Sequence, residues 1–202
     1  MKKVFLCAAV AIMSIATAQS QEVRLGIKGG YNMATLTGDG VDDASSRSSF
    51  HIGGLVEVPV SERFSIQPEV LYSSQGAEYT GTLTGVDDSK ITAKLDYIQV
   101  PIMAKFYAAE GFAIEAGPQI GFLAKSTAEF ESTVGDVTVT GEEDMEDIKS
   151  TDIGIGVGAS YRLPAGLFFG ARYNFGLTDI NEADNGIKMH NGVFQLSVGY
   201  SF

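Results

Sequence analysis

Apolar residues alternate with polar or small residues along most of this chain, and this two-residue period limits the fold more than any other feature. From Glu22 onward the alternation recurs eight times, in segments separated by turn-forming residues. A period of two places successive side chains on opposite faces of a β-strand. The sequence therefore predicts an all-β fold. The expected strands lie near 22–33, 49–59, 64–77, 91–108, 112–124, 151–162, 167–178 and 192–202.

The connections between these segments alternate in length. Three are tight, at 59–63, 108–111 and 163–166, and four are long and polar, at 34–48, 78–90, 125–150 and 179–191. An even number of antiparallel strands with short turns at one end and long loops at the other is typical of outer-membrane barrels, whose short turns are periplasmic. We predict an eight-stranded antiparallel up-and-down transmembrane β-barrel with short periplasmic turns and long extracellular loops.

The sense of the alternation supports a barrel that stands in lipid. In a membrane barrel the apolar set faces outward and the polar set inward, whereas a soluble barrel has the reverse. Counting along each strand on this basis places aromatic residues outward at both ends, as two interfacial girdles. The same count turns Tyr97 and Tyr107 inward. The girdle at the short-turn end contains Phe64, Phe106, Phe112, Tyr161, Phe169, Tyr200 and Phe202, and the other contains Tyr31, Phe50, Tyr72, Phe122, Tyr173, Phe175 and Phe194.

The first residues resemble a secretory signal. Met1-Lys2-Lys3 precedes an apolar stretch over 4–15, and Ala16-Thr17-Ala18 supplies the small residues of a cleavage site. The apolar stretch is shorter than the roughly 20 residues that a membrane-spanning helix needs. We expect a signal peptide at 1–18 and one barrel domain at 19–202. The single cysteine, Cys7, lies in the signal peptide, so the mature chain has no disulfide.

Charge distinguishes the interior from the loops. The formal net charge of −11 becomes −13 when Lys2 and Lys3 are removed, which disfavours nucleic acid as a partner. Charges of both signs fall on the inward face of the strands, where an eight-stranded barrel has room only for its own side chains. Buried charges must pair, so we expect a salt-bridged polar core, with a conduction path as the alternative. The inward set is Arg24, Lys28, Glu57, Glu69, Lys105, Glu115, Arg162 and Arg172.

The segment 125–150 is the most acidic part of the chain. Its carboxylates have no defined calcium-loop spacing, so we interpret them as a solvated loop, with a divalent cation or a surface partner as the alternative. The alternating piece Thr133–Thr140 is expected to extend a hairpin that offers a partner its edge. The acidic residues are Glu129, Glu131, Asp136, Glu142, Glu143, Asp144, Glu146 and Asp147.

The two histidines, His51 and His190, both fall near the long-loop end. A nucleophile needs a base within hydrogen-bonding reach, and the serines and aspartates near His51 form no tight pairing along one strand. We interpret both as rim histidines. The sequence contains no zinc spacing, phosphate-binding glycine loop or nucleophile elbow, and we expect no catalytic, metal or cofactor site.

Several motifs resemble a known family. Gly26-Ile27-Lys28-Gly29-Gly30-Tyr31-Asn32, Tyr97-Ile98-Gln99-Val100-Pro101-Ile102-Met103-Ala104-Lys105-Phe106 and the terminal Val198-Gly199-Tyr200-Ser201-Phe202 are similar to the outer-membrane β-barrel porin family (PorT-like) common in Bacteroidetes. The resemblance implies an OmpA/OmpX-like eight-stranded barrel. It also implies insertion by the outer-membrane assembly machinery, with Val198, Tyr200 and Phe202 in the C-terminal signal. The family has no shared catalytic residues.

Three functions follow from these observations. The first is a structural or surface-interaction barrel of the cell outer membrane, without catalytic activity, whose partners are lipid, the assembly machinery and a ligand or envelope protein at the long loops. The second is a small-solute porin or channel, which requires a continuous wet path through the lumen. The third is an outer-leaflet lipid-modifying enzyme, which requires a nucleophile and base that the motifs do not supply.

Overall fold

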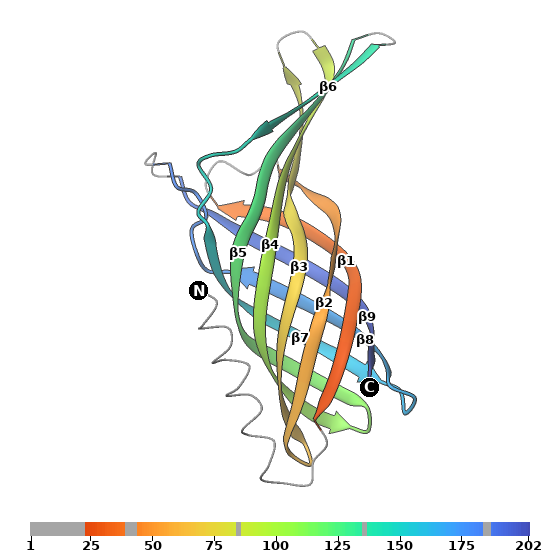
Figure 1. Ribbon diagram of the computed structural model, residues 1–202. Coiled ribbons are helices and arrows are strands. Elements are labelled where there is room, and N and C mark those ends of the chain that lie inside the picture. The colour runs from red at the N-terminus through yellow and green to blue at the C-terminus, as the bar shows by residue number, and fades with distance from the viewer. Residues whose placement is uncertain (1–22, 39–43, 84–85, 135–136, 184–186) are drawn as a thin grey trace.

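A computed structural model describes residues 23–38, 44–83, 86–134, 137–183 and 187–202 (Figure 1). The expected signal peptide lies outside the described residues. The described part of the chain forms nine strands and contains no helix long and apolar enough to span a bilayer. The strands are β1 (Arg24–Gly38), β2 (Ala44–Ser61), β3 (Phe64–Leu83), β4 (Val86–Ala109), β5 (Phe112–Val134), β6 (Val137–Asp144), β7 (Thr151–Arg162), β8 (Leu167–Gly176) and β9 (Met189–Ser201).

Eight of the strands form a closed antiparallel ring. The order is β1-β2-β3-β4-β5-β7-β8-β9, and β9 pairs back onto β1 over Gly26↔Ser201 to Gly38↔Met189. Closure removes the free edges that an open sheet would expose to lipid. The ninth strand, β6, pairs only with the upper part of β5 and lies outside the ring. The predicted eight-stranded barrel is confirmed.

The short turns gather at one end of the barrel. β2 and β3 are joined through residues 62–63, β4 and β5 through 110–111, and β7 and β8 through 163–166. Gly111 and Gly166 adopt positive φ angles of 73° and 89°, a conformation that costs glycine little and other residues more. These glycines allow the strands to reverse within a few residues, as the sequence predicted.

At the opposite end the strands continue further than the sequence predicted. β3 and β4 pair up to Leu83↔Val86, and β5 and β6 pair from Thr127↔Asp144 to Val134↔Val137. The expected loops at 78–90 and 125–150 are therefore largely strand. We call the upper parts of β3, β4 and β5, together with β6, the sheet extension. It projects beyond the ring as an antiparallel sheet in the order β3-β4-β5-β6 (Figure 1).

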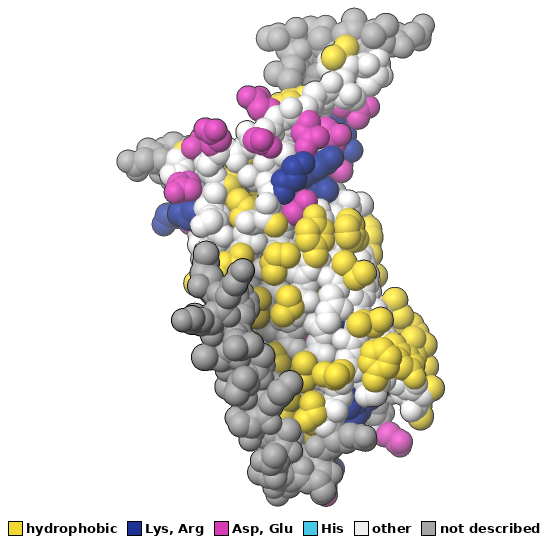
Figure 2. Space-filling model, in the orientation of Figure 1, with side chains coloured by type: hydrophobic (Ala, Val, Ile, Leu, Met, Phe, Trp, Pro, Cys, Tyr) yellow, Lys and Arg dark blue, Asp and Glu magenta, His cyan; other side chains and the backbone are white. Residues whose placement is uncertain are grey.

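The outer surface of the ring is apolar, as a lipid-facing surface must be. Ile27 is 59% exposed, Val70 58% and Ile114 51%. Hydrophobic side chains cover much of the barrel face seen in Figure 2. Polar side chains fill the interior, including Lys28, Asn32, Glu69, Gln99 and Arg172. The two girdles also take their expected outward positions at the two ends of this band.

The inside–outside pattern reverses where β3, β4 and β5 leave this band. On β4 the outward position changes from Ile98 to Asp96 and Lys94, while the inward position changes from Gln99 to Tyr97 and Leu95. The outward face of the sheet extension carries ion pairs, including Lys90–Glu78 at 2.7 Å. Charged side chains mark this transition in Figure 2. The extension therefore has the polarity of a water-exposed sheet.

Candidate functional site

The middle of the barrel holds a compact group of charges, which we call the central ion network. Lys28 of β1 and Arg172 of β8 both bind Glu69 of β3, each at 2.7 Å, and Arg172 also binds Glu115 of β5 at 2.7 Å. The guanidinium meets Glu69 through two nitrogens, a geometry that adds strength and specificity. Two cations and two carboxylates balance, so the network carries no net charge.

A second group surrounds Glu57 near the short-turn end. Arg24 lies 3.4 Å from its carboxylate, Arg162 3.3 Å and Lys105 3.9 Å, and the Tyr107 hydroxyl donates to the same carboxylate. Of these residues, Arg24, Glu57, Tyr107 and Arg162 line a cavity of about 580 Å³ that opens at the short-turn end. All eight charged residues predicted to point inward thus lie in the interior, in these two groups.

Little free space connects the two groups. Lys105 donates to Gln67 at 3.1 Å, and Gln67 donates to Glu69 at 2.7 Å, so side chains bridge the gap. The cavities beside Gln67 and Lys105 have volumes of about 10 and 20 Å³. A cavity of this size has room for about one water molecule. The lumen at this level is packed with polar side chains.

His51 lies inside the barrel, which contradicts the expected rim position. It is 1% exposed, and its Nδ1 is 2.7 Å from Asn32 Oδ1 while its Nε2 is 2.9 Å from Ser197 Oγ. Serine, histidine and an amide in this order resemble a nucleophile, its base and an orienting group. No local sequence pattern reveals this grouping, because its members come from β1, β2 and β9, far apart in the chain.

Access decides how to interpret the Ser197–His51–Asn32 grouping. Ser197 lines the cavity of about 20 Å³ in the middle of the barrel, which has no room for a lipid or ester substrate. Asn32 also donates to Ser73 Oγ and the Ser74 carbonyl, at 3.1 and 2.8 Å. Its neighbours therefore tie the grouping into the packed polar core.

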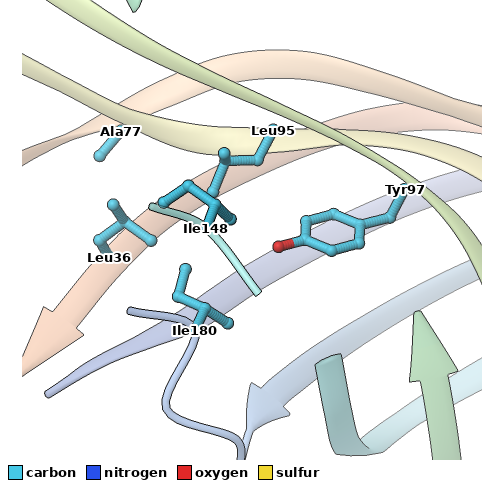
Figure 3. Close-up of a cluster of buried hydrophobic side chains, with 6 residues drawn as sticks. All are labelled: Leu36, Ala77, Leu95, Tyr97, Ile148 and Ile180. Carbon is cyan, nitrogen blue, oxygen red and sulfur yellow. The ribbon is translucent and has the colours of Figure 1, made fainter. Parts of the chain in front are cut away.

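The lumen changes character toward the long-loop end, where a cluster of buried apolar side chains fills it (Figure 3). We call this group the apolar cluster. Strand residues surround two loop residues, Ile148 and Ile180, which are 7% and 0% exposed. Sequence periodicity missed both isoleucines because they lie in irregular segments. The apolar cluster consists of Leu36, Ala77, Leu95, Tyr97, Ile148 and Ile180.

Backbone hydrogen bonds hold the two loop segments against each other. Lys149 N donates to the Ile180 carbonyl at 2.9 Å, Glu182 N donates to the Asp147 carbonyl at 3.0 Å, and Ile148 and Asn181 form a β-bridge. Asp179 accepts from the backbone N–H of Met189 at 3.0 Å, and this bond chiefly lowers the pKa of its carboxyl. The segments thus form an ordered cover over the lumen.

The acidic segment is a hairpin rather than a loop. Glu129 and Glu131 lie on β5, Glu142, Glu143 and Asp144 lie on β6, Glu146 and Asp147 follow, and Asp136 lies outside the described residues. Lys125 binds Glu142 at 2.8 Å and thereby lowers the pKa of its carboxyl. Among the described residues, no three His, Cys, Asp or Glu side chains are grouped closely enough to hold a metal ion.

The C-terminal strand closes the barrel in lipid. Val198, Tyr200 and Phe202 are 48%, 44% and 73% exposed, on the outward face of β9 or just beyond its end. The rings of Tyr200 and Phe202 meet edge-on with centroids 5.3 Å apart. Tyr200 and Phe202 belong to the girdle at the short-turn end.

Comparison with known proteins extends this description. The crystal structure of Ail, the attachment invasion locus protein of Yersinia pestis, has a TM-score of 0.54 at 15% identity, covering 90% of this chain and all of Ail. Ail in complex with the heparin analogue sucrose octasulfate gives 0.50 at 14% identity and the same coverage. Neisserial surface protein A gives 0.47 at 12% identity, covering 90% of this chain and all of that protein. No curated protein matches the chain.

The likeness to Ail supports the fold alone. An identity of 15% does not show that the two proteins bind the same ligand. The family described as "Outer membrane protein beta-barrel domain" matches residues 17–182, which is most of the chain. That match, with the closed ring and its apolar exterior, places the protein in the cell outer membrane. The chain belongs to the outer membrane protein β-barrel domain family.

Proposed function

We propose that this protein is a closed, non-catalytic barrel that acts through contacts made by its sheet extension at the cell surface. The observation that carries the proposal is the contrast between a filled lumen and a projecting sheet whose last strand, β6, forms a strand pairing with β5 alone among the described strands. An unpaired strand edge offers a row of backbone donors and acceptors to an extended segment of another chain. Val139 on this strand is 63% exposed.

Charge favours a basic partner segment. No ion pair of Glu131, Glu143 or Asp144 is found within the described ranges, so these carboxylates give the sheet extension uncompensated negative charge, in a chain whose formal net charge is −11. Such a surface repels polyanions and attracts cationic segments. A polysulfated ligand like the one bound by Ail is therefore disfavoured here.

Site-specific photo-crosslinking tests the proposed contact. A photoreactive residue at position 139 is expected to give a protein adduct on intact cells, whereas one at Leu196, which faces lipid, gives none. Equal adducts at both positions, or none at 139, contradict the proposal.

The filled lumen argues against the channel alternative. Planar-bilayer recordings of the refolded protein are expected to show no unit conductance steps, because the central ion network and the apolar cluster both occupy the path. Reproducible steps would favour a small-solute channel instead.

We also propose that the assembly machinery recognises the C-terminal strand through Val198, Tyr200 and Phe202, as the family resemblance implies. Support comes from the exposure of all three side chains on the outward face at the end of the chain.

A further inference from the structure

One buried carboxylate in the barrel has no cationic partner. Asp152, on β7, is 2% exposed, and no ion pair of its side chain is found in the described part of the chain. The other interior carboxylates, Glu57, Glu69 and Glu115, all bind arginine or lysine. An unpaired buried charge costs several kcal/mol. Among the described residues, Asp152 is therefore the one buried carboxylate without an arginine or lysine partner.

The cations of the central ion network are already engaged. Arg172 directs Nε, Nη1 and Nη2 to Glu115 and Glu69, and Lys28 also binds Glu69. His190 has its Nδ1 3.0 Å from the Thr178 carbonyl and forms no ion pair with Asp152 within 4.0 Å. In the described ranges no arginine or lysine pairs with Asp152.

Several polar atoms around Asp152 also have no partner. Asn191 donates to Asp152 Oδ2 at 2.9 Å, but Asp152 Oδ1, Asn191 Oδ1 and both amide atoms of Gln99 make no hydrogen bond with the described residues. The three residues are between 2% and 4% exposed. Buried polar atoms without partners are rare in native proteins and point to a bound water or ion. Several of these atoms are oxygens, the donors that hard cations select.

Gly121 lets the Gln99 side chain extend toward Asp152. Gln99 on β4, Gly121 on β5 and Asp152 on β7 occupy one row of cross-strand partners. A Cβ at Gly121 would lie 2.8 Å from the Gln99 amide nitrogen, so this amide lies over Gly121, between β4 and β7. The Tyr97 hydroxyl of the apolar cluster is 3.5 Å from the Asn191 amide, so the cluster adjoins this group.

From these observations we infer that Asp152, Asn191 and Gln99 form an interior site for a monovalent alkali cation, such as Na⁺ or K⁺, completed by water. A single carboxylate with neutral amide oxygens is balanced by one positive charge, whereas a divalent ion would leave a buried surplus. Its role is to complete the packing of the lumen beneath the apolar cluster. This site does not depend on the proposed contacts of the sheet extension.

Refolding in different salts tests the site. The mature protein is refolded in NaCl, KCl or choline chloride at equal ionic strength, and its unfolding temperature is measured. Choline is too large for the site, so we expect a midpoint about 5–10 °C higher in NaCl or KCl when the cation is at about 100 times its dissociation constant. Asp152→Asn removes this difference, whereas the exposed control Glu131→Gln retains it.

Other outcomes overturn the inference. Equal midpoints in all three salts indicate a protonated Asp152 among water molecules, and a cation effect that persists in Asp152→Asn places the ion elsewhere. If Asp152→Asn does not refold, anomalous diffraction from wild-type crystals grown with Rb⁺ tests whether the ion binds at Asp152. An anomalous peak within ligand distance of Asp152 Oδ1 supports the site, and its absence excludes it.

Discussion

At the scale of single residues, Arg172 is the centre of the interior. It contacts two buried carboxylates from two other strands, Glu69 and Glu115, so its removal leaves both without their main counter-charge. Removing one member of a buried charge group costs more than the group contributes as a whole, because the remaining charges stay buried. Arg24 differs, because its side chain is 35% exposed and its contact with Glu57 is 3.4 Å long.

We therefore expect Arg172→Ala to lower the free energy of unfolding by about 3–5 kcal/mol. Arg24→Ala is the matched control and is expected to cost about 1 kcal/mol or less. Urea unfolding of the refolded proteins measures both. Similar losses in the two variants would mean that the central ion network contributes no more to stability than the partly exposed contact between Arg24 and Glu57.

The Ser197–His51–Asn32 grouping gives a second prediction at this scale. Because a cavity of about 20 Å³ adjoins Ser197, a fluorophosphonate probe is expected to leave the folded protein unlabelled. Labelling that disappears in Ser197→Ala would instead establish an accessible nucleophile. The matched control is Ser160→Ala, since Ser160 lines the same cavity without contacting His51.

At the scale of strands, the β5–β6 hairpin depends on cross-strand charge. Lys125 holds the pKa of the Glu142 carboxyl below its ordinary value of 4.5, first through a hydrogen bond and then through its charge. A carboxyl whose pKa is lowered by folding stabilises the hairpin above its unfolded pKa. That contribution is lost as the pH falls through the folded value.

We expect Lys125→Met to return the pKa of Glu142 to about its ordinary value, as measured by NMR titration. Lys90→Met is the control, because Lys90 pairs with Glu78 at the other side of the sheet extension. An unchanged pKa in Lys125→Met would show that this ion pair does not form in solution.

The closing strand gives another prediction for an element. If its last aromatic is read during assembly, Phe202→Ala is expected to reduce the amount of protein in the outer membrane several-fold. Phe169→Ala removes a ring of the same girdle, 48% exposed, away from the chain end, and is expected to have a smaller effect. Quantitative blotting of membrane fractions compares them. Equal losses would assign Phe202 to anchoring alone.

The strands of the ring could be predicted from the sequence, whereas their continuation above the membrane could not. Alternation identified all eight ring strands and turned Tyr97 and Tyr107 inward, because lipid on one side enforces a strict two-residue period. It failed above the membrane, where water faces the outer surface and polar residues continue in strand geometry, so 78–90 and 125–150 were wrongly interpreted as loops. The positions of Ile148 and His51 depend on contacts between distant strands and loops, which no local pattern encodes.

At the scale of the whole molecule, the ring and the sheet extension are separable. The ring closes through β1 and β9 without β6, and its interior contacts lie below the hairpin. Ala128 and Glu143 are direct partners across β5 and β6, which makes them suitable ends for a shorter turn.

Replacing residues 129–142 with Asn-Gly, a favoured two-residue hairpin turn, is therefore expected to leave a barrel that still migrates differently in boiled and unboiled samples on a gel. The same variant should lose the partner adduct. A second variant with Gly-Ser in place of Asn-Gly controls for the choice of turn. If neither variant folds, the extension is required to close the ring.

The reversal of polarity along β3, β4 and β5 also determines how deeply the protein is immersed. On β4, Ile98 faces outward and is 38% exposed, while Asp96 lies two residues further along, about 6–7 Å by the rise of a strand. If the barrel sank by that distance, charged side chains would enter the acyl chains. If it rose, the girdle at the short-turn end would leave the interface. The protein is thus matched to a bilayer of one thickness, and a thinner or thicker membrane would have to deform around it.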